Sequence, residues 1–128
     1  YGTTDYPGFY IADSGYDIEY AVSDPQDVAE LAVQRDALGL RSAILVAQPV
    51  PVADQLPVDV HDRVLADALA AAAQQGVTGH DMTPFLLDQV QRETGGRSLD
   101  VNIAVYRGNV ALGARVAVAL GKRRDSAR

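Results

Sequence analysis

Apolar residues recur at intervals of three and four in the first half of the chain, and this spacing predicts two helices there. The first helix begins at Ser23, a capping residue, has Pro25 in its first turn, and ends at Gly39. The second helix covers about residues 58–75 and ends at Gly76. An alanine run inside it favours helix and permits close packing against a neighbour.

The second half of the chain has two more stretches with the same periodicity. The third helix begins at Thr83-Pro84 and closes at Gly95-Gly96. The fourth is capped by Ser98 and runs to about Leu120. Residues 122–128 are polar and basic, which is typical of a frayed tail. We therefore divide the chain into one domain, residues 1–121, and a tail, residues 122–128.

Three short apolar segments predict strands rather than helices. Residues 9–11 and 18–22 are aromatic and β-branched and are separated by a turn. Residues 42–47 form a continuous apolar run before a proline-rich loop, as in a strand covered on both faces. One buried strand cannot make a sheet by itself. We therefore predict a helix-rich α/β fold whose sheet is completed by a part outside this chain.

The composition narrows the class of protein. At 128 residues the chain is one domain in size, and 48% apolar residues are enough for a core. A net charge of −6 argues against nucleic acid as a partner. No apolar run approaches the length of about 18 residues that indicates a membrane span, so we expect no membrane partner and a cytoplasmic location. Because the chain starts with Tyr1 rather than Met, we expect a processed protein or a piece of a longer one.

The histidines and the N-terminal carboxylates are the first candidates for chemistry. His61 lies near a helix start and His80 in a glycine-flanked loop, but a metal site needs more ligands at suitable spacing. Asp5, Asp13 and Asp17 cluster loosely, as acid–base carboxylates can, although loop aspartates usually stabilise turns. For both groups the structural interpretation is favoured over the catalytic one.

Lysine and the glycine pair give two further candidates. Lys122 is the sole lysine, and an imine-forming lysine needs burial or nearby positive charge. Arg123 and Arg124 supply the charge, but the frayed, exposed setting of Lys122 in the tail argues against this role. Residues 95–98 (Gly-Gly-Arg-Ser) lead into a helix N-terminus, whose N–H groups can hold an anion. The same four residues also fit a plain helix end followed by a capping serine, which is the favoured interpretation.

The last predicted helix carries polar residues beside its apolar face. Asn102, Tyr106, Asn109 and Gly113 follow 4-3-4 spacing and therefore share one stripe. Buried amides must be hydrogen bonded. The stripe therefore indicates either a contact into a ligand cavity or hydrogen bonds to a neighbouring loop, and spacing alone does not decide between them.

Five segments, in order along the chain, carry a resemblance that none of them would carry alone. They are Tyr1–Tyr10, Gly39–Pro51, Gly79–Leu87, Thr94–Leu99 and Asn102–Ala104. Together they resemble the pseudouridine-5′-phosphate glycosidase family, also called the indigoidine synthase A-like family, over residues 1 to about 120. The match is to the C-terminal portion of that family only.

The resemblance implies an activity and a set of partners. The family reversibly cleaves the C–C glycosidic bond of pseudouridine 5′-phosphate to uracil and ribose 5-phosphate. A lysine opens the ribose by forming an imine, a glutamate and an aspartate assist, and a divalent metal, typically Mn²⁺, is used. Members are homotrimers with a layered α/β/α fold. The lysine, glutamate and aspartate belong to the preceding part of the family, so we expect the N-terminal part of the same enzyme as a partner.

One functional residue of the family carries over to this chain. The asparagine of the Ser-Leu-x-x-Asn-Ile motif, here Asn102, contacts substrate in the family, which favours the ligand interpretation of the stripe. Two positions depart from the family pattern. Gln48 stands where asparagine is common, and Gly108 falls where the family has Asn-Asn-Ala further along the helix. A glycine inside a helix costs roughly 1 kcal/mol relative to alanine.

Two alternatives to a portion of one enzyme chain stay open. The chain could be a binding or oligomerisation module without catalysis, or one half of a split enzyme whose N-terminal half is a separate polypeptide. A soluble, monomeric isolated chain would count against the fragment and the split enzyme, because both predict exposed apolar surface.

Overall fold

The computed structural model describes residues 1–126, with side chains for residues 1–123. These residues form α1 (Pro25–Ala37), α2 (Val58–Gln74), the short 3₁₀ turn η1 (Gly79–Asp81), α3 (Met82–Glu93) and α4 (Arg97–Ser126). Within residues 1–126 there is no strand, and one isolated antiparallel bridge joins Asp5 to Asp17.

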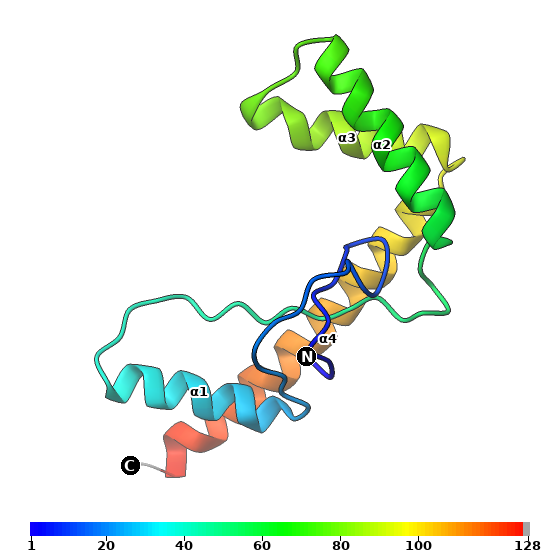
Figure 1. Ribbon diagram of the computed structural model, residues 1–128. Coiled ribbons are helices and arrows are strands. Elements are labelled where there is room, and N and C mark those ends of the chain that lie inside the picture. The colour runs from blue at the N-terminus through cyan, green and yellow to red at the C-terminus, as the bar shows by residue number, and fades with distance from the viewer. Residues whose placement is uncertain (127–128) are drawn as a thin grey trace.

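The longest helix organises the molecule (Figure 1). The 30 residues of α4 span about 45 Å at 1.5 Å per residue. α1 packs on α4 towards its C-terminal end, and α3 contacts α4 and carries α2 at the other end. Residues 1–22 and the extended residues 40–57 cross the middle of α4 between these two ends (Figure 1).

The helix boundaries follow local capping signals, with shifts of one or two residues from the sequence prediction. Asp24, not Ser23, caps α1, because its carboxylate accepts the Gln26 N–H at 2.8 Å while Pro25 takes the first helical position. Gly39, with φ 68°, follows α1 as the predicted left-handed residue. α4 already begins at Arg97.

The end of α4 differs more from the prediction. The helix continues to Ser126, past the predicted end near Leu120, so residues 122–126 are helical instead of a frayed tail. Residues 127–128 lie outside the described part of the chain. Arg123 helps to hold this last stretch, since its guanidinium pairs with Glu30 of α1 at 3.0 Å.

The three predicted strands are wrong for the chain taken by itself. Residues 1–22 instead fold back as an irregular loop, in which Tyr6 N–H donates to Tyr16 O and Ile18 N–H donates to Thr4 O. Residues 42–47 are extended but unpaired, and Leu45 is 80% exposed rather than buried. A strand needs a neighbour to supply its ladder of hydrogen bonds, and no described segment lies in register to do so. The predicted sheet is therefore not seen, and the described chain is helix-rich.

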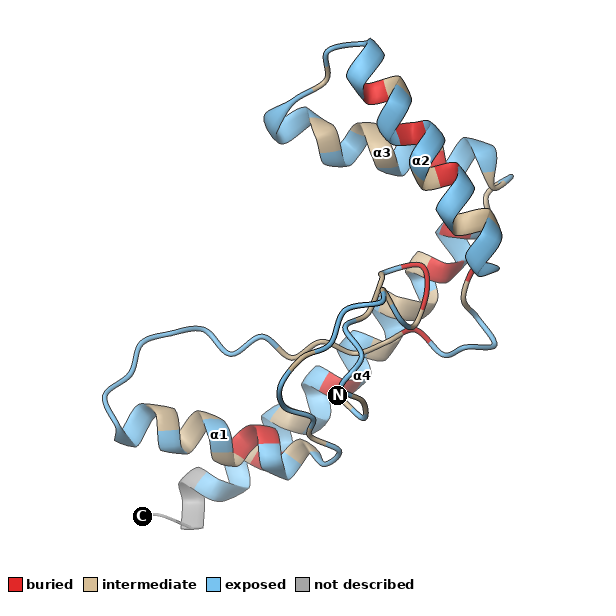
Figure 2. Ribbon diagram, viewed as in Figure 1, coloured by how far each residue is buried: buried red, intermediate tan, exposed pale blue. Residues whose placement is uncertain are grey.

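The main core lies where α2, α3 and the first half of α4 meet the N-terminal segment (Figure 2). Leu56 and Val64 are its most buried large side chains. The core cluster consists of Tyr10, Val50, Leu56, Val64, Ala68, Val90 and Val101.

Much apolar surface is left uncovered. The accessible surface is 8635 Å², whereas a compact monomer of this mass exposes about 6,600 Å². Figure 2 shows that most of the second half of α4 is exposed, whereas α1 is a mixture of exposed, half-buried and buried residues.

The segment Arg97–Arg123 of α4 is long and apolar enough, by length and composition only, to cross a membrane, which the sequence analysis did not predict. A core helix of a soluble protein passes the same test, so this finding is weak evidence for a membrane span.

Candidate functional site

The polar stripe predicted on the last helix lines hollows along one side of α4. Asn102 and Tyr106, with Leu99 and Ile103, line a hollow of about 250 Å³. Asn102 is half-buried, and its side chain makes no hydrogen bond with the described residues. The expectation of an amide bonded to a neighbouring loop is therefore not met at Asn102. Its amide is available to a ligand or to another part of the protein.

Asn109 lies two turns further along the same stripe and lines a larger cavity of about 460 Å³. The opposite wall comes from two segments far away in the sequence, residues 6–9 and residues 45–48. On the α4 side of the cavity, Val105 lies beside Asn109 in the lining. Asn109 also borders a neighbouring hollow with Gly113, so all four stripe residues line such hollows. Asn102 is the half-buried member of the stripe, whereas Tyr106, Asn109 and Gly113 are exposed at the borders of these hollows.

Gln48 contributes an unpaired amide to the 460 Å³ cavity. Its Oε1 is completely buried and has no hydrogen-bond partner. The amide lies against Gly108, where an added Cβ would sit 3.8 Å from Nε2. The two positions that depart from the family pattern are therefore neighbours in space. The sequence signal for Gln48 was only its departure from the family, and its burial was not predicted.

Tyr10 fixes the N-terminal segment beside this cavity. Its side chain is buried, hydrogen bonds with Ser98 at the start of α4, and stacks edge-on against Phe9 at a centroid distance of 4.6 Å. Its backbone carbonyl accepts the Leu56 N–H at 2.9 Å. Burial raises the pKa of Tyr10 above its ordinary value, and the hydrogen bond with Ser98 opposes this shift only in part. Sequence reasoning missed this contact, because its two partners are far apart in the chain.

Phe9 has a strained backbone. Its φ of 67° is the one positive value at a non-glycine position in the described residues. For a bulky residue this conformation is uncommon and is maintained only where surrounding contacts impose it. The strain turns the Phe9 ring, which is 43% exposed, to the border of the 460 Å³ cavity.

The turn at residues 95–98 is a structural helix start rather than an anion site. Ser98 N–H donates to Thr94 Oγ1 at 3.2 Å, and the Arg97 and Leu99 N–H groups donate to backbone carbonyls of Thr94 and Gly96. Ser98 is buried, with its hydroxyl engaged by Tyr10. The first N–H groups of α4 are therefore already used inside the protein, as the favoured interpretation predicted.

The remaining candidates stay apart from one another. His61 lies 3.0 Å from Asp62, and His80 lies 3.1 Å from Asp81, in different parts of the α2–α3 unit. Among the described residues no three His, Asp or Glu side chains come together to hold a metal ion. The described side chains therefore do not fit Mn²⁺ by themselves, and the position of its ligands stays a prediction.

Lys122 lies on α4 beside a cavity of about 540 Å³ between α1 and α4. Arg115 and Arg123 line the same cavity, together with Asp24 at the start of α1. Lys122 is far along the helix from the stripe, since 20 residues of α4, about 30 Å, separate it from Asn102. This distance adds a geometric reason to reject Lys122 as the nucleophile at the Asn102 site.

Comparison with known sequences gives the family. The family described as indigoidine synthase A like protein matches residues 1–119. A pseudouridine-5′-phosphate glycosidase of Saccharopolyspora erythraea is 58% identical over 120 residues, and that of Streptomyces griseus is 51% identical. The matches cover 94% and 93% of this chain but 40% and 37% of those relatives.

Comparison with solved structures gives the same fold. An indigoidine synthase A-like protein of Thermotoga maritima superposes with a TM-score of 0.81 at 28% identity, over 94% of this chain and 39% of that one. A prealnumycin C-glycosynthase, solved with ribulose 5-phosphate, superposes with a TM-score of 0.86 at 18% identity, over 98% of this chain and 41% of that one. The chain therefore belongs to the indigoidine synthase A-like family, and it spans about two fifths of the length of its matched relatives.

Proposed function

We propose that this chain is the C-terminal portion of a pseudouridine-5′-phosphate glycosidase. The complete enzyme adds water across the C–C glycosidic bond of pseudouridine 5′-phosphate and releases uracil and ribose 5-phosphate, reversibly. The observation that carries this proposal is the 58% identity, over 94% of the chain, to a relative with that name. The fold gives less specific support, because the two solved structures superpose over almost the whole chain but share less of its sequence.

The large exposed surface supports the proposal that a further part of the enzyme covers this chain. The accessible area exceeds that of a compact monomer by about 2,000 Å², which is the size of a large, permanent interface. The backbone N–H groups of residues 43–46 donate no hydrogen bond within the described chain. An extended apolar segment with unpaired backbone groups is a template for strand pairing. We therefore propose that the N-terminal part of the enzyme pairs with residues 43–46 and completes a layered α/β/α fold.

The division of chemistry follows from this arrangement. A C–C bond to a sugar carbon needs an electron sink, which an imine between a lysine and the opened ribose supplies. That lysine lies outside this chain, in the proposed N-terminal part. This chain supplies Asn102, whose unpaired amide is held on a rigid helix at the edge of a hollow and can donate and accept hydrogen bonds to substrate. We also propose a homotrimeric, cytoplasmic enzyme that uses Mn²⁺, as the resemblance implies.

The test is turnover by the complete protein and by this chain alone. The complete protein, incubated with pseudouridine 5′-phosphate and Mn²⁺, should release uracil, measured by chromatography. This chain alone should release none, and adding the separately produced N-terminal part should restore release. A complete protein that binds the substrate without releasing uracil would overturn the glycosidase proposal and favour a binding module.

A further inference from the structure

Two unpaired primary amides face the same cavity from different parts of the chain. Gln48 comes from the end of the extended segment and Asn109 from the middle of α4, and both line the 460 Å³ cavity. Neither side chain makes a hydrogen bond with the described residues, and Gln48 Oε1 is completely buried. Gln48 Nε2 also has no partner and is not among the buried unpaired atoms, so it is the amide atom that is open to a ligand.

Gly108 lies against the Gln48 amide. The glycine brings no side chain to the helix surface, and the three terminal atoms of Gln48 lie 3.8 to 3.9 Å from the place a Cβ would take. A longer side chain at residue 108 would occupy the space of the amide. An alanine would fit at these distances, so it is the lack of a larger side chain at residue 108 that leaves the amide its place.

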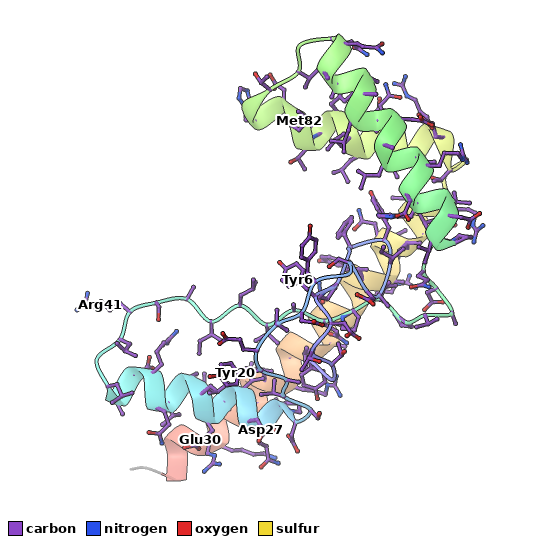
Figure 3. The ribbon with its side chains drawn as sticks, viewed as in Figure 1. Tyr6, Tyr20, Asp27, Glu30, Arg41 and Met82 are labelled. Carbon is purple, nitrogen blue, oxygen red and sulfur yellow. The ribbon has the colours of Figure 1, made fainter. Side chains whose placement is uncertain are left out.

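The other lining residues indicate which ligand chemistry fits. The wall holds aromatic rings, Phe9 and Tyr6, the latter labelled on the N-terminal segment in Figure 3, with the two amides. No Lys, Arg or His lines the cavity, so a phosphate has no charged partner there. A carboxylate is likewise absent from the wall. Aromatic surface plus primary amides suits a flat, uncharged ring with polar edges.

We propose that the Gln48 amide binds the base of the substrate, with Nε2 donating a hydrogen bond to a C=O on one edge of a pyrimidine ring. Oε1 is buried behind the cavity wall, so Nε2 is the amide atom that reaches the ring. Asn109 faces the same ring from α4. The inference rests on the proposed function, since it takes the pyrimidine to be the uracil part of pseudouridine 5′-phosphate.

The position of Asn102 is consistent with this assignment. Asn102, Val105 and Asn109 lie at i, i+3 and i+7 on α4 and therefore on one face. About 10 Å of helix axis separates Asn102 from Asn109, which is comparable with the length of a nucleoside. A base at Gln48 and Asn109 thus leaves the rest of the substrate to extend towards Asn102.

The test uses the complete enzyme in the direction of synthesis, with uracil and ribose 5-phosphate as separate substrates. Gln48→Met keeps the length of the side chain and removes the amide. Its KM for uracil should rise about 10-fold, while its KM for ribose 5-phosphate should change less than about 2-fold. A side chain that merely supports the fold would change both constants together or neither, and either result would overturn the inference.

Gln55→Met is the matched control. The Gln55 amide oxygen already accepts the Ala12 N–H at 2.8 Å, so it is satisfied inside the protein. This variant should lower the melting temperature and leave the ratio of the two KM values unchanged. If wild-type enzyme makes no product, the proposed function fails, and calorimetric titration with uracil then decides the inference. Binding by wild type that is lost in Gln48→Met upholds it, and no binding by wild type overturns it.

Discussion

The two ends of α4 differ in how much of their apolar surface is buried by other parts of this chain. Around the first half of the helix, α2, α3 and the N-terminal segment bury a shared cluster that includes Leu56, Val64 and Val101. Around the second half, α1 is the helical neighbour within the described chain, and residues 42–45 of the extended segment are exposed and belong to no strand. The first region is therefore built from contacts within this chain. The second region instead leaves apolar side chains such as Leu45 and Val118 exposed.

The sharpest way to break this comparison is to truncate one leucine in each region. Leu56, 1% exposed, should cost about 2–5 kcal/mol of unfolding free energy when replaced by alanine, because a cavity forms in a packed core. Leu45→Ala should cost less than about 0.5 kcal/mol in this chain. Urea unfolding measures both variants.

The same pair of variants should behave differently in the complete protein. If the N-terminal part covers residues 43–46, Leu45→Ala becomes a core truncation there and should cost about 2 kcal/mol or more. An equally small cost of Leu45→Ala in both proteins would contradict the proposed cover.

Asn102→Ala tests the function of the polar stripe. Removing one amide that contacts the substrate should lower turnover of the complete enzyme by about 100-fold, the size of effect seen for one lost transition-state donor. Because the amide has no hydrogen-bond partner in the described chain, the unfolding free energy should hardly change. Asn109→Ala, two turns away on the same helix face, is the matched variant for uracil KM. Unchanged turnover with lost stability would return Asn102 to a structural role.

Tyr10→Phe tests the contact that holds the N-terminal segment on α4. Loss of the hydrogen bond with Ser98 should lower the free energy of unfolding by about 1 kcal/mol.

The pKa of Tyr10 is raised in the folded protein, so folding favours the neutral phenol. Its stabilising effect is fully present below about pH 10, the ordinary tyrosine value, and is lost as pH rises through the higher folded pKa. Unfolding measured across this range should show a decline in wild type that is smaller in the variant.

The smallest expected effect is a gain. Gly108→Ala should stabilise α4 by about 0.5–1 kcal/mol, because alanine is the better helix former and its Cβ meets Gln48 at an ordinary contact distance of 3.8 Å. Thermal unfolding measures the gain. Gly108→Leu is the contrasting variant, since its larger side chain displaces the Gln48 amide. A loss of stability in Gly108→Ala would show that the amide cannot yield even to a methyl group.

The helices could be predicted from the sequence because their boundaries are local. Pro25 at the first helical position and the left-handed glycines Gly39 and Gly76 act on the residues beside them, and α1 and α2 end close to where these signals place them. The predicted strand at residues 42–47 could not be judged this way, because a strand forms only when a neighbouring strand supplies its hydrogen bonds. No segment of the described chain pairs with these residues.

The candidate site was predicted only as far as one helix face reaches. The spacing of Asn102, Tyr106 and Asn109 indicated a shared stripe, and the structure places them along hollows on α4. Gln48 and Tyr10 could not be assigned from spacing, because they meet α4 through loops that cross it from distant parts of the chain. The ligand contact of Asn102 stays a prediction.

The length of α4 has a mechanical consequence. Asn102 and Ala119, which is buried in the half of α4 that α1 covers, are 17 residues apart on one continuous rod, or about 26 Å. A tilt of only about 2° around that distant contact would move Asn102 by about 0.9 Å, a displacement that can cost an active site about 100-fold in rate. Val101, beside Asn102, is buried in the main core, so the rod is held at both ends, and these two separated contacts together set the position of the amide.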